Sequence, residues 1–137
     1  MAVIYVARSK SLSDWGATVG ISKNLFKVGI AAASAKEGVA ALNEAGFAGA
    51  TDWALVASAE CEAGDEAAAI ERLARKEAAV DPRYYPRIKG AAGIFRVKPK
   101  NVENSLLVEK AMAGEASLDF KLTTADIGNY LIKNATA

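Results

Sequence analysis

The segment at residues 2–8 is apolar on both of the faces that a β-strand presents. Two sets of alternating side chains are apolar, namely Val3, Tyr5 and Ala7, and Ile4 and Val6. Side chains on a strand point to opposite faces at every second residue, and a strand that is apolar on both faces is buried on both sides. The sequence therefore predicts that this segment is a central strand.

Other local signals predict further strands and a first helix. Residues 25–30, 53–57 and 94–97 are rich in the β-branched and aromatic residues that strands favour. Ser34 is followed three residues later by Glu37, and the pair forms a capping-box pattern. We expect a helix over residues 34–45, because Val39 and Leu42 follow at helical spacing and Gly46 provides a C-terminal stop.

The remaining segments are assigned from capping residues, prolines and periodicity. Residues 9–24 have no sustained period and are interpreted as a long connection. Asp65 is expected to cap a long helix that runs to Val80, before the proline-containing loop at residues 81–86. Two last helices are expected, from about residue 99 and over residues 124–133. Their predicted inward-facing residues are Val102, Leu106, Leu107 and Ala111 in the first, and Ile127, Tyr130 and Leu131 in the second.

These elements predict an α+β fold, with a small sheet of three to four mainly antiparallel strands flanked by helices. A chain of 137 residues is one domain on length. We divide it into a core at residues 1–100 and a helical extension at residues 101–137 that docks on the same core. No segment reaches the roughly 18 to 20 apolar residues of a membrane span, and the N-terminus lacks a signal-peptide pattern. We expect a cytoplasmic protein with no membrane partner.

The absence of histidine limits the chemistry. The chain has no His and a single cysteine, Cys61. Catalysis by a Ser–His or Cys–His pair is excluded, as are zinc sites that use histidine. A catalytic site here must use carboxylates, Tyr, Lys, Arg, hydroxyl groups or a bound metal. No phosphate-loop signature is present, so we expect no nucleotide cofactor.

The charges are segregated along the chain. Residues 72–100 carry a net charge of +7, whereas residues 1–71 carry −4 and residues 101–137 carry −2. A local excess of positive charge is the electrostatic footprint of nucleic-acid binding. The candidate nucleic-acid-binding residues of this block are Arg72, Arg75, Lys76, Arg83, Arg87, Lys89 and Arg96. Solvated surface charge remains the alternative.

Four features occur in an order that is similar to a known family. Val3-Ile4-Tyr5 is followed by Lys27-Val28-Gly29, then by a helix with Glu71 and by the strand at residues 93–97. This arrangement resembles the GIY-YIG nuclease superfamily, and especially its small phage-type branch, over roughly residues 2–98. The resemblance implies an antiparallel sheet with a tyrosine that helps to deprotonate water and a helix glutamate that holds one divalent metal.

The resemblance implies catalytic roles for Tyr5, Lys27 and Glu71, and a Mg²⁺ or Mn²⁺ cofactor bound by Glu71. Two alternatives remain open: Glu71 could instead form a surface pair with Arg75, and Glu77 could replace it as the metal ligand. The family's phosphate-binding arginine has no counterpart, because its position falls on Glu37 and Gly38. Lys36 is the nearest substitute.

Two functions are consistent with these residues. The first is a metal-dependent endonuclease, weak or degenerate, that hydrolyses phosphodiester bonds in DNA or RNA. The second is a non-catalytic module of the same fold that binds nucleic acid or another protein. Loss of the arginine favours the second function. The sequence leaves the oligomeric state open.

Overall fold

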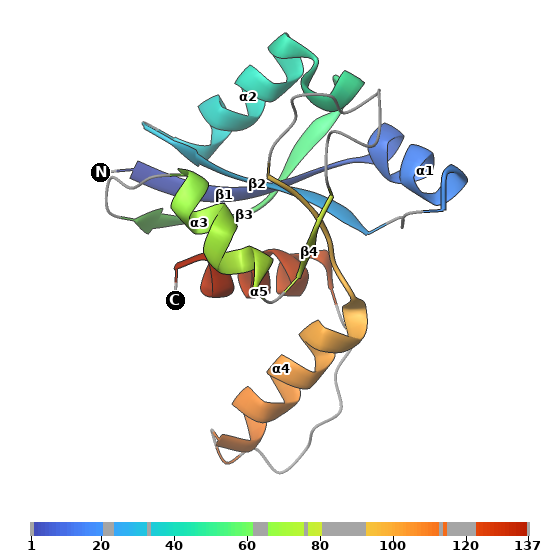
Figure 1. Ribbon diagram of the computed structural model, residues 1–137. Coiled ribbons are helices and arrows are strands. Elements are labelled where there is room, and N and C mark those ends of the chain that lie inside the picture. Colours follow the sequence, from blue (N-terminus) through green and yellow to red (C-terminus); the bar gives the residue numbers. More distant parts are fainter. Residues whose placement is uncertain are drawn as a thin grey trace.

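The computed structural model describes residues 2–20, 24–32, 34–61, 66–75, 77–80, 93–112, 114 and 123–136 (Figure 1). The described strands form one antiparallel sheet in the order β3-β1-β2-β5-β4. Their bounds are β1 Ala2–Ser9, β2 Leu25–Ala31, β3 Trp53–Cys61, β4 Ala78–Ala79 and β5 Ile94–Arg96. The described helices are α1 Lys10–Thr18, α2 Ala35–Ala45, the short 3₁₀ helix η1 Phe47–Gly49, α3 Glu66–Ala74, α4 Pro99–Met112 and α5 Thr124–Thr136.

The α+β fold class is confirmed. Four strands have three or more residues, and β4 adds a two-residue fifth strand at one edge of the sheet. β1 lies between β3 and β2, as the apolar pattern of residues 2–8 predicts, and Ile4 and Val6 are completely buried. None of the helices in the described residues is long and apolar enough to cross a membrane.

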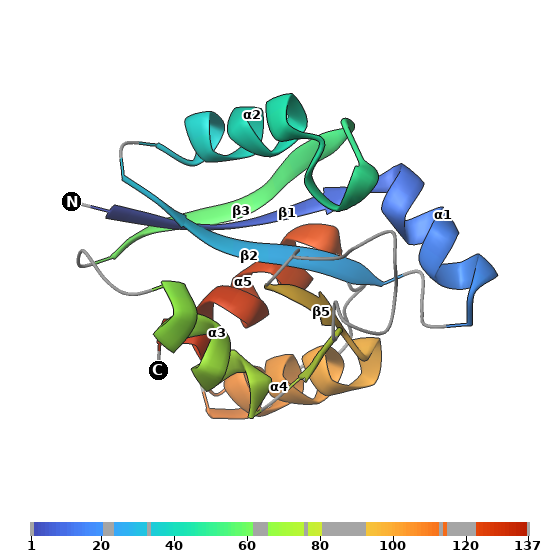
Figure 2. The same ribbon diagram turned by 45° about the horizontal axis from the view of Figure 1, so that its top comes forward.

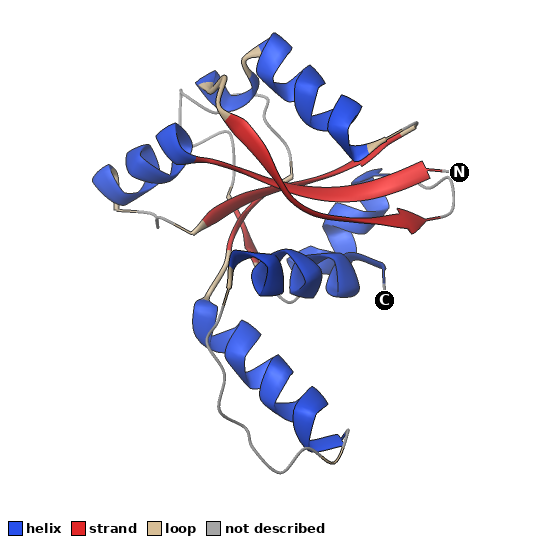
Figure 3. Ribbon diagram, turned by 180° about the vertical axis from the view of Figure 1, so that it is seen from behind, coloured by secondary structure: helices blue, strands red, loops and turns tan. Residues whose placement is uncertain are grey.

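The sheet has an apolar core on each face. Tyr5 and Ala7 of β1 pack with residues of α1 and α2 on one face, whereas Ile4 and Val6 pack with residues of α3, α4 and α5 on the other. Figures 2 and 3 show α2 on one side of the sheet and α5 on the opposite side. The alternation of side chains in β1 thus supplies both cores, and residues beyond 100 belong to the second.

The expectation of a long connection over residues 9–24 is wrong, because α1 begins directly after β1. The Ser9 hydroxyl oxygen accepts a hydrogen bond from the backbone N–H of Leu12 at 3.2 Å and so caps the helix. Asp52, which precedes β3, accepts hydrogen bonds from the Ser9 hydroxyl and from the backbone N–H of Ser11 at 3.0 Å. The start of α1 is therefore fixed by a residue 43 positions away from Ser9, which local periodicity does not reveal.

These contacts predict an acid dependence of stability. Hydrogen bonds from Ser9 and Ser11 lower the pKa of Asp52 from its ordinary value to about 2. A lowered pKa in the folded state gives stability that is present above the unfolded pKa and is lost as the pH falls through the folded pKa. The difference in unfolding midpoint between the wild type and Asp52→Asn should therefore be constant at neutral pH and shrink as the pH falls from about 4 towards 2.

Thermal unfolding followed by circular dichroism at a series of pH values measures this difference. Asp14→Asn, which removes a carboxylate from an exposed position of α1, is the matched control. A difference between wild type and Asp52→Asn that does not change with pH contradicts the prediction.

The predicted helix over residues 34–45 is confirmed as α2. The Ser34 hydroxyl oxygen accepts a hydrogen bond from the backbone N–H of Glu37 at 3.2 Å, and Gly46 ends the helix in the left-handed conformation, with φ of 62°. Of the two hydrogen bonds of a capping box, only this one, from the Glu37 N–H to the Ser34 hydroxyl, is formed in the described contacts. Glu37 is also one of the residues that line the pocket described below.

Replacing Ser34 by alanine should lower the free energy of unfolding by about 0.5 to 2 kcal/mol, because the Glu37 N–H loses its acceptor. Denaturant unfolding measures the change. Ser34→Asn is the control, since asparagine caps helices as well as serine does. An unchanged midpoint for the alanine variant contradicts the assignment of Ser34 as the cap.

The expectation that the third helix reaches Val80 is also wrong. α3 ends at Ala74, and residues 78 and 79 form β4 against β5. The cause is tertiary: the Glu77 side chain is buried, and it accepts hydrogen bonds from the backbone N–H of Lys98, the Asn101 amide and the Tyr130 hydroxyl. The proposed cap Asp65 and the loop at residues 81–86 lie outside the described residues.

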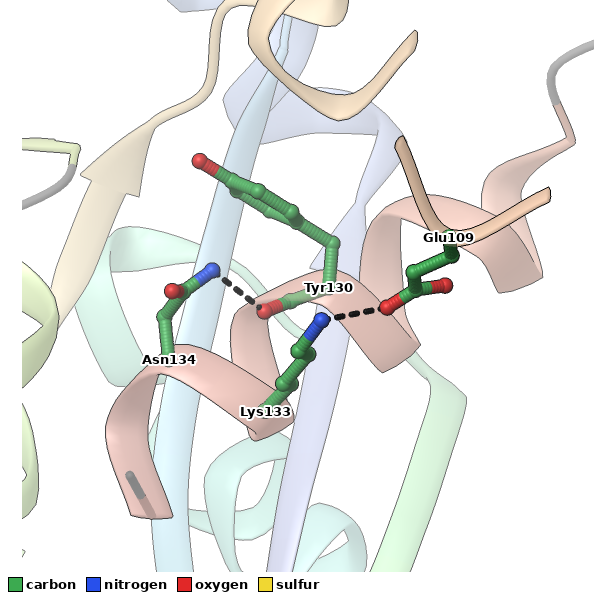
Figure 4. A network of polar contacts seen from close by, with 4 residues as sticks. All are labelled: Glu109, Tyr130, Lys133 and Asn134. Atoms are coloured by element: carbon green, nitrogen blue, oxygen red, sulfur yellow. Dashed lines mark hydrogen bonds and ion pairs between the residues drawn. The ribbon is translucent and has the colours of Figure 1, made fainter. Parts of the chain in front are cut away.

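The last two expected helices are present as α4 and α5. Of the predicted inward face of α4 only Val102 is fully buried, and Ala111 is exposed. In α5, Ile127 and Leu131 are buried in the sheet core. Figure 4 shows how the two helices are linked: Lys133 of α5 forms an ion pair with Glu109 of α4. Within α5, Asn134 donates a hydrogen bond to the carbonyl oxygen of Tyr130.

Candidate functional site

A pocket of about 500 Å³ lies beside β2, between α2 and the first residue of α3. It contains four side chains that carry ionisable groups and a set of small and apolar ones. The ionisable residues are Tyr5, Lys27, Glu37 and Glu66, and the others are Ile30, Ala31, Ala32, Gly38, Ala41, Leu42, Ala45 and Phe47. Tyr5 and Lys27, which the sequence analysis predicts as site residues, therefore lie in one pocket.

The pairing of β1 with β2 brings Tyr5 and Lys27 to the same face. Tyr5 pairs with Gly29, and Ala7 pairs with Lys27. Gly29 has a specific role, since a Cβ atom at this position would lie 2.6 Å from the Tyr5 hydroxyl oxygen and 2.8 Å from Glu66 Oε1. The absence of a side chain lets the phenol lie across β2 and approach the Glu66 carboxylate.

Lys27 is buried in the wall of the pocket, with 4% of its surface exposed. Its ammonium group lies 3.6 Å from Glu66 Oε1 and 4.9 Å from the centroid of the Phe47 ring. Gly93 makes room for it, because a Cβ atom there would come within 2.8 Å of the Lys27 Nζ atom. Burial lowers the pKa of Lys27, and the neighbouring Glu66 carboxylate opposes that shift.

Glu66 is the first residue of α3 and reaches the outer edge of β2. Its Oε1 atom accepts a hydrogen bond from the backbone N–H of Ile30 at 3.0 Å. β5 pairs with β2 only over Leu25–Lys27, so Glu66 binds the strand beyond the end of β5. Both contacts of the carboxylate use Oε1, and Oε2 takes part in neither.

The Tyr5 side chain is 5% exposed. Burial and the nearby Glu66 carboxylate raise the pKa of Tyr5 to about 12. The phenol is therefore protonated at neutral pH, and it can donate a hydrogen bond but is a poor base. The raised pKa disfavours the expected role of Tyr5 in deprotonating water, which stays a prediction.

Glu71, the predicted metal ligand, does not join these residues. It is exposed and does not line the pocket. Glu66 and Glu71 are five positions apart, which separates them by about 140° around the helix axis. Glu66 was not among the site residues predicted from the sequence. A usable signal was its place in the first turn of a helix that follows a strand, where a carboxylate can reach the edge of the sheet.

The position expected for the arginine falls on Glu37 and Gly38 at the start of α2. A Cβ atom on Gly38 would lie 2.8 Å from Tyr5 Cε1 and 3.1 Å from the Ala31 Cβ atom, so α2 packs closely on the Tyr5 ring. Lys36, the expected substitute, is exposed and does not line the pocket. Among the described residues that line the pocket, Lys27 is thus the only cation.

Glu77, the second candidate metal ligand, lies in a different place and has a structural role. It is 3% exposed, and its three hydrogen-bond donors come from the start of α4 and from α5. The hydrogen bond from Tyr130, at 2.9 Å, and the charge of Glu77 join with burial in raising the pKa of Tyr130. This carboxylate is occupied by protein donors and does not line the pocket, which disfavours Glu77 as the alternative to Glu71.

The predicted nucleic-acid-binding residues are only partly described. Arg75 and Arg96 are exposed, whereas Arg72 is half-buried and its Nε atom donates a hydrogen bond to the carbonyl oxygen of Ala135 at 2.7 Å. Arg72 thus joins α3 to α5. The other predicted residues lie outside the described part of the chain, namely Lys76, Arg83, Arg87 and Lys89.

The donor set of the pocket suits a weakly held divalent cation. The described residues contain no group of three or more Cys, Asp or Glu side chains able to hold a metal, and the chain has no His. Mg²⁺ needs fewer protein ligands than that, because it keeps several waters and binds through one or two carboxylates together with substrate phosphate. Glu66 and Glu37 can supply such carboxylates.

Comparison with protein-family models, curated proteins and solved structures finds no match to this chain. The geometry of the pocket and the resemblance of its motifs are therefore the observations that bear on function.

Proposed function

We propose that the pocket around Tyr5, Lys27 and Glu66 is a one-metal phosphodiesterase site of the GIY-YIG type, which acts slowly on nucleic acid in the cytoplasm. The observation that carries the proposal is the convergence of these three side chains from β1, β2 and α3 on one pocket. Residues with perturbed pKa values that meet in a pocket are typical of functional sites, and two of these three have such values.

The charges of the pocket support a requirement for a divalent cation. Glu37 and Glu66 are acidic and Lys27 is basic, so the ionised pocket has a net charge of −1. A phosphodiester is itself an anion, and like charges repel it from such a site. A bound Mg²⁺ or Mn²⁺ ion would reverse the sign of the pocket and polarise the phosphoryl oxygen.

The chain's own residues have separate roles in this proposal. Glu66 would hold the cation through its carboxylate, and the Ile30 N–H keeps that carboxylate in place. Lys27 would offset the phosphate charge, and the protonated Tyr5 phenol would orient the attacking water by donating a hydrogen bond. Glu37, the second carboxylate of the pocket, would accept the proton of that water.

A second function is supported by Gly38. The missing guanidinium removes a bidentate contact that would stabilise charge on the phosphate, and α2 packs too closely on the Tyr5 ring to admit a side chain there without rearrangement. This packing favours a non-catalytic module of the same fold that binds nucleic acid. Such a module would keep its binding surface, which includes the exposed Arg75 and Arg96, and lack turnover.

Cleavage assays separate the two functions. Plasmid and single-stranded substrates are incubated with the protein in Mg²⁺, in Mn²⁺ and in excess chelator. We expect slow cleavage that needs the metal, since the pocket without it repels phosphate. Binding is measured in parallel in chelator at two salt concentrations. Binding without cleavage in either metal supports the non-catalytic module, and the absence of both contradicts both functions.

A further inference from the structure

β3 leaves one edge of the sheet without a partner strand in the described part of the chain. It is nine residues long and pairs with β1 from Cys61 opposite Ala2 to Trp53 opposite Ser9, except at Val56, which has no partner in this register. On the other side, the Asn43 side chain binds the backbone N–H and carbonyl groups of Trp53. No such partner exists among the described residues for the backbone beyond Trp53.

The two edges of the sheet differ in how they avoid pairing. At the far edge, β4 has two residues, and a very short edge strand is a poor template for another strand. At the near edge, β3 has one irregularity, a register shift opposite Val6 and Ala7. After this shift, Ala57–Cys61 pairs regularly with β1 and contains no lysine or proline. Of the usual protections of an edge strand, this run thus lacks a lysine, a proline and a bulge.

We propose that the run Ala57–Cys61 pairs with the same run of a second copy of this chain, antiparallel and about a two-fold axis at Ala59. Antiparallel pairing about a two-fold axis is self-complementary, so each residue of one copy has a fixed partner in the other. Ala59 lies opposite Ala59, Ser58 lies opposite Glu60, and Ala57 lies opposite Cys61. The two sheets join into one continuous sheet.

The side chains of this run suit pairing with the same run of a second copy better than pairing with an unrelated strand. Four of the five are small, which lets another backbone approach, and Ser58, Ala59 and Glu60 are exposed. Glu60 is the one charged residue of the run, and the two-fold register places it opposite the Ser58 hydroxyl instead of opposite the other Glu60. Like charges directly opposite each other destabilise a pair of strands, and this register contains no such pair.

Two lysine substitutions at neighbouring positions test this register. Ala59→Lys places two ammonium groups opposite each other on the axis, and it should weaken the dimer by at least about tenfold. Ser58→Lys places each ammonium group opposite a Glu60 carboxylate, and two such pairs should tighten the dimer by about 2- to 30-fold. Val108→Lys is the control, because Val108 is an exposed residue of α4, away from β3.

Sedimentation equilibrium over about 10 to 500 μM measures the dissociation constants of weak dimers. Circular dichroism melts establish that each variant is folded. The expected result is a concentration-dependent dimer for the wild type and for Val108→Lys, a tighter one for Ser58→Lys, and a monomer for Ala59→Lys. A monomeric wild type overturns the proposal. So does a dimer that tolerates Ala59→Lys, or one that both lysines on β3 disrupt equally.

Discussion

Replacing Glu66 by glutamine is expected to lower metal-dependent cleavage by about 10²-fold or more, the scale for losing one group that stabilises charge in the transition state. The substitution removes the negative charge that would hold the metal, and it also removes one charged partner of the buried Lys27 ammonium group. It keeps the shape of the side chain. The amide oxygen of glutamine can still accept the hydrogen bond from the Ile30 N–H, so the end of β2 should remain in place.

Glu71→Gln is the matched control, because it makes the same chemical change five positions further along α3. Glu71 is exposed and lies outside the pocket, so its loss should leave the rate within about twofold, as is usual for surface substitutions away from such features. Rates of plasmid nicking in Mn²⁺ and melting curves of both variants measure the effect. Equal rates for wild type and Glu66→Gln contradict the assigned metal ligand. Loss of activity in Glu71→Gln alone would restore the assignment made from the sequence.

Replacing Glu77 by alanine should lower the free energy of unfolding by about 2 to 4 kcal/mol, because buried donors lose their acceptor and a cavity remains. The Glu77 carboxylate accepts hydrogen bonds from Lys98, Asn101 and Tyr130, at 3.3, 3.1 and 2.9 Å respectively. These donors belong to the start of α4 and to α5, so the loss should loosen the contact of both helices with the sheet.

Tyr130→Phe removes one of the three donors and should cost about 1 kcal/mol, a typical value for one hydrogen bond. Glu71→Ala is the control for removing a glutamate from an exposed site, and its effect should stay within about 0.5 kcal/mol. Denaturant unfolding of the three variants gives the comparison. If Glu77→Ala is no less stable than Glu71→Ala, the carboxylate does not hold these helices together.

The part of the site that lies in motifs on paired strands could be predicted from the sequence. Tyr5 and Lys27 lie in motifs on β1 and β2, and antiparallel pairing brings them to one face of the sheet. The glutamate was not predictable in the same way, because a single helix offers several carboxylates at different angles around its axis. Only the position of α3 against the edge of β2 brings Glu66 to the pocket and leaves Glu71 exposed to solvent.

Local signals in the sequence were enough to predict several of the elements. The two-faced apolar pattern of residues 2–8 gave a central strand, and Ser34 with Gly46 gave both ends of α2. By contrast, the start of α1 and the end of α3 depend on contacts with residues far away in the sequence. α1 starts where the distant Asp52 anchors Ser9 and Ser11, and α3 stops before Glu77, whose carboxylate accepts hydrogen bonds from Asn101 of α4 and Tyr130 of α5. The physical reason is the range of the interactions: caps and side-chain alternation act within a few residues, whereas the hydrogen bonds of Asp52 and Glu77 join segments that meet only after the chain has folded.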